Sequence, residues 1–285
     1  MPDTSDPRSH ASAHSNNALH LHILGSGSKG NCALVEGPQG LIMIDNGFSR
    51  KRVLERMNAL GLSESDVRAL VLTHEHSDHV SGIEVWCRRW EGPMFSSTGT
   101  PAQRKYLAAL PFTELNPGEA FEVAGIRVTT FATSHDVVNP MGFRFDCNGD
   151  AIGYATDTGT LSADALDTLA DTRILALESN HDVPMLRVGP YPRYLQDRIL
   201  SDSGHLSNEQ AATAARQLVT ERTEHLVAMH ISQDNNLPNL AVRSFADALG
   251  ATPDNDLGST ATLQHGSGST LHIRAAGQNR PITIL

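Results

Sequence analysis

The feature that most constrains the fold of this chain is a run of metal-ligating residue types directly after a short apolar segment. Residues 69–72 read Ala-Leu-Val-Leu, and residues 73–79 read Thr-His-Glu-His-Ser-Asp-His. Three imidazoles and a carboxylate this close together would be costly to bury without a cation. We therefore expect a buried strand to deliver a tight loop to a metal site, with His74 and His76 pointing one way and Asp78 and His79 the other.

Three more residues of the same chemistry follow at wide intervals, each after an apolar, strand-like stretch. They are His135, Asp157 and His230. Imidazole and carboxylate hold zinc, manganese or iron at neutral pH. Seven such residues are enough for two divalent ions, zinc or manganese, with open positions for water and substrate. Because water shared by two ions becomes hydroxide near neutral pH and attacks phosphorus or carbonyl centres, we predict a two-metal hydrolase.

Composition narrows the class of protein. The chain has 285 residues, of which 39% are hydrophobic, and its longest apolar runs fall far short of the roughly 20 residues that span a bilayer. Residues 1–17 lack the apolar stretch of a secretory signal, so we expect a disordered tail there and one domain over residues 18–285. The short apolar runs predict no membrane association. The three cysteines form no Cys-x-x-Cys pair, which favours a reduced cytoplasm.

The net charge of −10 argues against a protein that coats nucleic acid nonspecifically. It does not exclude a nuclease with a local basic patch.

The pattern of short apolar runs and turn residues predicts two packed sheets with helices outside, an α/β (α+β) class. We expect strands at residues 19–24, 32–36, 41–44, 69–72, 126–133, 141–145, 151–155, 174–177, 225–229, 260–263 and 270–273. We expect helices at 50–60, 82–90, 242–249 and from Ser207 onward, where Ser207 and Gln210 form a capping-box pattern.

The pattern His-x-His-x-Asp-His resembles the signature of the metallo-β-lactamase superfamily, and the resemblance runs in order along nearly the whole chain. Residues 41–47 look like its first motif, in which Asp45 would brace the metal loop. The resemblance implies a four-layer αββα sandwich. It implies one metal on His74, His76 and His135, a second on Asp78, His79 and His230, and Asp157 as the bridge. Asp78 would then both ligate and orient the nucleophile.

A second motif, Gly-His-Leu-Ser-Asn-Glu at residues 204–209, lies between the last two metal motifs at a predicted helix start. His205 suits a general acid that protonates a leaving alkoxide near neutral pH. It resembles the catalytic histidine of the RNase Z and RNase J nucleases, and Glu178 then resembles the carboxylate that orients it. The alternatives are that His205 only begins a helix and that Glu178 is structural.

A stretch from Arg187 to Arg198 interleaves basic and aromatic groups, among them Tyr191 and Arg193. Such groups bind phosphates and unstacked bases, although a solvated helix face paired with Asp197 and Asp202 is the alternative. Several segments resemble the YycJ (WalJ)-type family of bacterial cytoplasmic proteins linked to DNA exonuclease activity. They include residues 27–32, 178–182, 204–208 and 230–236, and within them we expect His181, Asn235 and Asn236 to contact substrate.

Two departures separate the chain from the resembling RNases. The segment between Asp157 and His230 is too short for the inserted domain of RNase J, and there is no long Gly/Pro-rich arm like that of RNase Z.

We therefore predict a phosphodiesterase or exonuclease acting on nucleic acid ends, DNA in particular. The alternatives are a small-molecule hydrolase of cyclic phosphodiesters, thioesters or lactones, and a binding module without catalysis. The remaining histidines, namely His20, His22, His225, His265 and His272, are expected to be structural or solvated.

Overall fold

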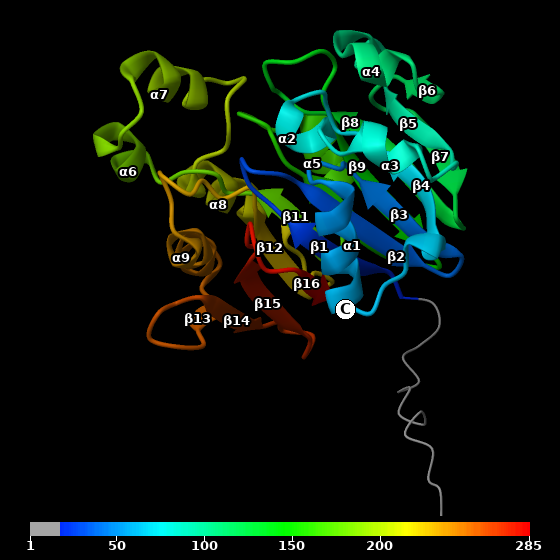
Figure 1. The fold of residues 1–285 in the computed structure, drawn as a ribbon. Helices are drawn as coiled ribbons and strands as arrows, with labels where there is room; N and C mark the ends of the chain where they lie inside the picture. The colour runs from blue at the N-terminus through cyan, green and yellow to red at the C-terminus, as the bar shows by residue number, and fades with distance from the viewer. Residues whose placement is uncertain (1–17) are drawn as a thin grey trace, which may run out of the picture.

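The computed structural model describes residues 18–285, and the predicted tail of residues 1–17 lies outside the described residues. Two mixed β-sheets pack face to face (Figure 1). The first contains, in spatial order, β16 (Ile282–Ile284), β1 (His20–Gly25), β2 (Cys32–Gly37), β3 (Gly40–Ile44), β4 (Val67–Val71), β5 (Met94–Ser97) and β6 (Phe112–Leu115).

The second sheet is larger and contains the strands from β7 to β15. It contains, in spatial order, β13 (Thr252–Pro253), β14 (Thr260–Gln264), β15 (Thr270–Ala275), β12 (His225–Met229), β11 (Ile174–Glu178), β10 (Asp150–Ala155), β9 (Met141–Cys147), β8 (Ile126–Ala132) and β7 (Ala120–Val123). Strands β10, β11, β12 and β15 are parallel neighbours.

Helices cover the outer side of each sheet. The helices are α1 (Arg50–Ala59), α2 (Ser77–Val80), α3 (Ile83–Cys87), α4 (Lys105–Ala108), α5 (Ala163–Leu169), α6 (Val183–Val188), α7 (Arg193–Ile199), α8 (Asn208–Leu218) and α9 (Pro238–Leu249), with 3-10 turns at Glu64–Asp66 and Pro101–Gln103. Helices α1, α3 and α4 pack on the first sheet, and α5, α8 and α9 on the second. The predicted αββα sandwich is confirmed.

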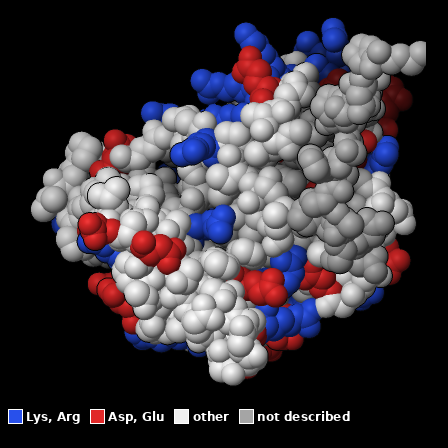
Figure 2. All heavy atoms as spheres, turned by 90° about the horizontal axis from the view of Figure 1, so that it is seen from below, with Lys and Arg blue, Asp and Glu red and all other residues white. Residues whose placement is uncertain are grey.

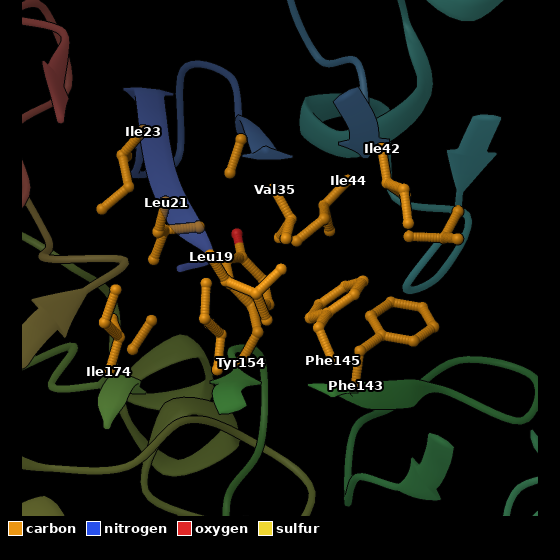
Figure 3. Close-up of a cluster of buried hydrophobic side chains, with 14 of the residues drawn as sticks. Leu19, Leu21, Ile23, Val35, Ile42, Ile44, Phe143, Phe145, Tyr154 and Ile174 are labelled. Atoms are coloured by element: carbon orange, nitrogen blue, oxygen red, sulfur yellow. The ribbon is translucent and has the colours of Figure 1, made fainter. Parts of the chain in front are cut away.

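Alternating side chains build the core between the sheets. Leu21 and Ile23 of β1 point toward the second sheet, which contributes Ile174 and Tyr154 on the facing side, as Figure 3 shows, and all four are buried. Because successive residues of a strand face opposite sides, His20 and His22 lie on the other face of β1. The register of β1 is therefore set by which of its residues are apolar.

One charged pair holds the edge of this core. Asp150, at the start of β10, accepts two hydrogen bonds from the Arg173 guanidinium, at 2.9 and 2.8 Å, and one from the backbone N–H of Leu19 at 2.8 Å. Burial opposes ionisation of Asp150, but the bonds from Arg173 outweigh it and lower the pKa of the carboxyl. The pair joins the second sheet to the segment that leads into β1.

Three local predictions had different outcomes. Ser207 caps α8 with both bonds of the capping box, as predicted. The helix expected over residues 82–90 covers only Ile83–Cys87, because the chain must turn before Pro93 to enter β5, and a residue preceding proline disfavours helix. The loop expected after His76 is instead the short helix α2, which carries Asp78 and His79.

Within residues 18–285 no helix is both long enough and apolar enough to cross a membrane. Cys32, Cys87 and Cys147 are all free thiols among the described residues.

Candidate active site

The candidate site forms where strands of both sheets end. Asp45 follows β3, and the run that begins at Thr73 follows β4, in the first sheet. In the second sheet Asp157 follows β10, Glu178 is the last residue of β11, and His230 follows β12. Neighbouring parallel strands end at the same edge of a sheet, so residues distant in sequence meet there.

The structure brings the first predicted ligand set together. His74, His76 and His135 each offer a ring nitrogen, and these nitrogens lie within 4.8 Å of one another. The ring centroids are 4.8 to 5.2 Å apart, and the rings meet edge to face. We call these residues the first ligand group.

A second ligand group consists of Asp78, His79 and His230, whose potential ligand atoms also lie within 4.8 Å of one another. Asp157 lies between the two groups. Its carboxylate oxygens are 3.4 Å from a ring nitrogen of His79, 3.4 Å from His230 Nδ1 and 3.9 Å from His135 Nε2. Asp157 therefore lies within reach of residues of both ligand groups.

The buried atoms of these residues fit metal ions. Within residues 18–285, His74 Nε2, His230 Nε2 and Asp157 Oδ2 are buried and have no hydrogen-bond partner. Buried polar atoms are almost always paired, and these are nitrogen and oxygen donors of the kind that bind zinc and manganese. Two divalent cations held by the two ligand groups would satisfy them.

The backbone at three of the site residues is strained. Asp45, Asp157 and His230 have φ angles of 57°, 55° and 52°, in the left-handed region that non-glycine residues rarely adopt. Each such residue costs roughly 1–3 kcal/mol and persists where the surroundings hold it. The sharp turns at these strand ends aim the three side chains at the site.

Asp45 braces the metal loop, as the family resemblance implies. Its Oδ1 accepts the backbone N–H of Thr73 at 2.8 Å, and its Oδ2 accepts the Thr73 hydroxyl at 2.7 Å and His79 Nδ1–H at 2.8 Å. Burial alone would lower the pKa of His79, but the carboxylates of Asp157, Asp78 and Asp45 raise it to about 9. The bond to Asp45 leaves Nε2 of His79 facing the other ligands.

Glu178 collects four N–H donors on one buried carboxylate. Oε1 accepts from His205 Nδ1 at 2.8 Å and from His230 Nδ1 at 3.0 Å. Oε2 accepts the backbone N–H groups of Thr158 at 2.9 Å and Leu206 at 3.2 Å. Burial opposes ionisation, but the two histidines hold the pKa of Glu178 well below its usual range. An ionised carboxylate only accepts, so the Nδ1 atoms of both histidines carry protons.

His205 lies against the candidate metal ligands. Its ring centroid is 4.9 Å from that of His135 and 5.2 Å from that of His230. The side chain is 18% exposed, so it reaches solvent or a bound molecule, while Nδ1 is held by Glu178. The remaining nitrogen, Nε2, is the one available for chemistry.

The Gly-rich loop of residues 26–31, between β1 and β2, supports the second ligand group. Its place in the site was not predicted from sequence. Asn31 Nδ2 lies 3.2 Å from Asp78 Oδ2 and 2.9 Å from His79 Nε2. The hydroxyl of Ser26 accepts the backbone N–H of His230 at 2.7 Å. In the sequence, residues 27–32 stand out only for their resemblance to the YycJ-type family.

The same loop is held by Gln278, a residue far along the chain. Gln278 Oε1 accepts the backbone N–H of Lys29 at 2.8 Å, and its Nε2 donates to the carbonyl of Gly30 at 2.7 Å. Nothing in the local sequence signals this contact, because it joins residues 249 positions apart.

The predicted Arg/Tyr stretch lies on α6, α7 and the turn between them, which project together from one edge of the molecule (Figure 1). Arg187 and Arg193 lie 3.2 and 3.4 Å from the same Asp197 oxygen, and the Tyr191 hydroxyl donates to Asp234 at 2.9 Å. These basic groups are therefore already paired with acids, as in the solvated-face alternative.

Three other predicted substrate contacts are buried. His181, Asn235 and Asn236 are 0%, 1% and 2% exposed. Asn236 bonds to the carbonyls of Ser179 and Asn180 and exchanges hydrogen bonds with the Asn208 side chain. The structure thus places these three side chains beneath the surface rather than on it.

Sequence comparisons relate this chain to a family of known proteins. The sequence profile of the Beta-lactamase superfamily domain matches residues 41–231. The chain is 35% identical over 235 residues to Exodeoxyribonuclease YycJ of Bacillus anthracis, a match that covers 81% of this chain and 89% of that protein. The chain belongs to the YycJ family of this superfamily. Exodeoxyribonuclease WalJ of Streptococcus pneumoniae is 32% identical over 233 residues, which cover 80% of this chain and 87% of that protein.

Among solved structures, a diphosphatase from the PhnP family has a TM-score of 0.62 at 17% identity. The match covers 93% of this chain and 97% of that one. At this identity the similarity shows the shared fold.

Proposed function

We propose that this protein is a metal-dependent phosphodiesterase that removes nucleotides from DNA ends. The observation that carries the proposal is the His205–Glu178 pair beside the two ligand groups. A proton donor at this position is needed when the leaving group is a sugar alkoxide. The relatives YycJ and WalJ, both named exodeoxyribonucleases, support DNA as the substrate.

In this proposal the first ligand group would hold one divalent cation and the second ligand group another, and Asp157 would serve as a ligand between the two groups. Zinc or manganese would suit the mixed imidazole and carboxylate donors. When bound, the two cations would lower the pKa of a shared water and stabilise charge on phosphate oxygens.

The side chains of the chain itself supply the proton transfers. His205 donates from Nε2 to the departing oxygen, because Nδ1–H is committed to Glu178. Glu178 fixes the tautomer and the ring orientation, and it stabilises the imidazolium. Asp78, whose side chain is 23% exposed, accepts a hydrogen bond from the attacking water and orients it.

For substrate contacts we retain Arg187, Arg193 and Tyr191, whose side chains reach the surface. Their acidic partners would exchange for backbone phosphates when DNA binds. On the face seen in Figure 2, the described basic and acidic side chains are intermixed. We propose that DNA contacts the strand-end site and the α6–α7 projection, where Arg187, Arg193 and Tyr191 lie. His181, Asn235 and Asn236 would shape this region from below.

We further propose that residues 18–285 act as one domain, since both sheets supply site residues. A cytoplasmic location is supported by the three free thiols in the described part of the chain.

The test is digestion of DNA and RNA, single- and double-stranded and labelled at either end, with manganese and then with zinc. We expect short products from one end of DNA and none from the Asp78→Ala or Asp157→Ala variants, whose circular dichroism should match the wild type. His272→Ala, a histidine substitution outside the site, is the matched control and should cleave normally. Intact DNA and RNA under all conditions would refute the proposal.

A small phosphodiester is the second candidate substrate, favoured by the net charge of −10 and by the ion-paired arginines. Hydrolysis of bis-p-nitrophenyl phosphate together with intact nucleic acid would establish it. The His205→Ala variant tests whether His205 protonates the leaving group. We expect it to release an alkoxide roughly 10²–10⁴-fold more slowly and to release p-nitrophenolate at nearly the wild-type rate.

A further inference from the structure

A second group of metal-ligating side chains lies outside the candidate active site, on the outer face of the first sheet. His20 and His22 alternate with the core residues of β1, so both point away from the core seen in Figure 3. Glu36 stands directly opposite His20 on the neighbouring strand β2. The strand pairing therefore fixes three potential ligands side by side.

The two histidines hydrogen-bond to Glu36, and the potential ligand atoms are close enough together to hold one ion. His20 Nδ1 lies 3.1 Å and His22 Nε2 lies 3.0 Å from the same oxygen, Glu36 Oε2. The three potential ligand atoms all lie within 4.8 Å of one another. Tetrahedral zinc with ligand distances of about 2.0–2.1 Å separates its ligands by roughly 3.3 Å, so only small side-chain shifts would be required.

His22 also has the outer contact that metal-bound histidines have. Its Nδ1 lies 2.9 Å from the Thr283 hydroxyl on β16. With zinc bound in place of the Nε2–H···Glu36 bond, donation of Nδ1–H to that oxygen would leave the Nε2 lone pair directed at the ion, which is how a ligating histidine is normally oriented. His22 is almost completely buried, so its ring has little freedom to turn away.

We propose that His20, His22 and Glu36 bind a further divalent zinc ion, distinct from the ions of the active site. Three protein ligands leave one position for water, and the exposed side of Glu36, whose side chain is 42% exposed, provides the opening. Through Thr283 the ion would fasten β16, the C-terminal edge strand, to β1 and β2. Its role is structural and does not depend on the proposed nuclease function.

The experiment measures zinc per chain at equilibrium as free zinc is raised from the nanomolar to the micromolar range. The full-length chain is used in a His10→Ala/His14→Ala background, because the two tail histidines could add weak binding. We expect Glu36→Gln and His20→Ala each to bind one zinc ion fewer than this background protein. Equal zinc content in all three proteins would overturn the proposal and leave a hydrogen-bonded His–Glu–His group.

Two further variants make the result specific. Thr283→Val removes only the outer contact and should weaken the additional ion roughly 10–100-fold. His265→Ala, whose ring bonds to the Thr223 carbonyl, is the matched control and should keep the full zinc content. DNA cleavage by Glu36→Gln should equal that of the background protein. Loss of zinc from His265→Ala as well would count against a defined site.

Discussion

The four donors around Glu178 make the Glu178→Gln variant a demanding test of the site. The carboxylate offers about four lone pairs and no proton, which suits two histidine N–H groups and two backbone N–H groups. An amide of nearly the same shape offers one acceptor oxygen and two donor hydrogens. It can satisfy only one of the two pairs of donors, and its NH₂ group must face the other pair.

The two orientations of the amide have different costs. With the NH₂ group toward Thr158 and Leu206, two buried backbone donors are unpaired at about 1–3 kcal/mol each, or roughly 2–6 kcal/mol in all. With the NH₂ group toward the histidines, His205 and His230 can both move their proton to Nε2, which costs less. We therefore expect the second orientation and a largely retained fold.

With the NH₂ group toward the histidines, the variant should lose metal binding and catalysis rather than stability. His230 Nε2, now protonated, cannot ligate a metal, so we expect at least roughly 10–100-fold weaker metal binding. His205 loses the carboxylate that stabilises its charged form, so we expect DNA cleavage at saturating metal to fall roughly 10²–10⁴-fold.

The assay combines urea unfolding, metal titration and cleavage of end-labelled DNA on one preparation. Glu209→Gln makes the same chemical change at an exposed position of α8 and should behave as wild type in all three measurements. Wild-type metal affinity and cleavage rate in Glu178→Gln would refute both the assigned tautomers and the proposed role of the pair.

Three other substitutions test separate parts of the structure. Asp150→Asn should lower the free energy of unfolding, measured by urea unfolding, by about 1.5–3 kcal/mol. Because folding lowers the pKa of Asp150, the difference between variant and wild type should be complete above pH about 4 and should disappear at lower pH. Gly47→Ala would place a methyl 1.7 Å from the Asp78 carbonyl oxygen and should abolish metal binding, whereas Gly277→Ala, with no described atom within 4 Å of the new methyl, should not. Gln278→Ala should weaken the second metal roughly 10-fold through the loop it holds, as zinc titration would show; unchanged affinity would assign Gln278 to stability alone.

The sequence predicted best where each signal was local. The histidines of residues 74–79 follow a buried strand and would be costly to bury without a cation, and the capping box of α8 is contained in four residues. The apolar alternation of β1 gave its core face directly. Such signals depend on the physical chemistry of a few neighbouring residues.

Contacts between distant segments could not be predicted in this way. Gln278 gives no sign of its role, because its partners lie at the opposite end of the chain. The burial of Asn236 depends on an amide network with Asn208 that only the packed structure defines. The arginines of the α6–α7 projection looked available for phosphate, because sequence does not show which acids fold against them.

The hydrogen bonds between Gln278 and the Gly-rich loop also affect the order in which the site can form during synthesis of the chain. Chains emerge from the ribosome N-terminus first, and the loop that touches Asp78, His79 and His230 is synthesised among the first residues of the fold. Gln278, which holds this loop, follows Lys29 by 249 positions in the chain. The loop therefore lacks this contact until Gln278 has been synthesised, and a chain that ended before Gln278 would carry every proposed metal ligand without the residue that holds the loop beside them.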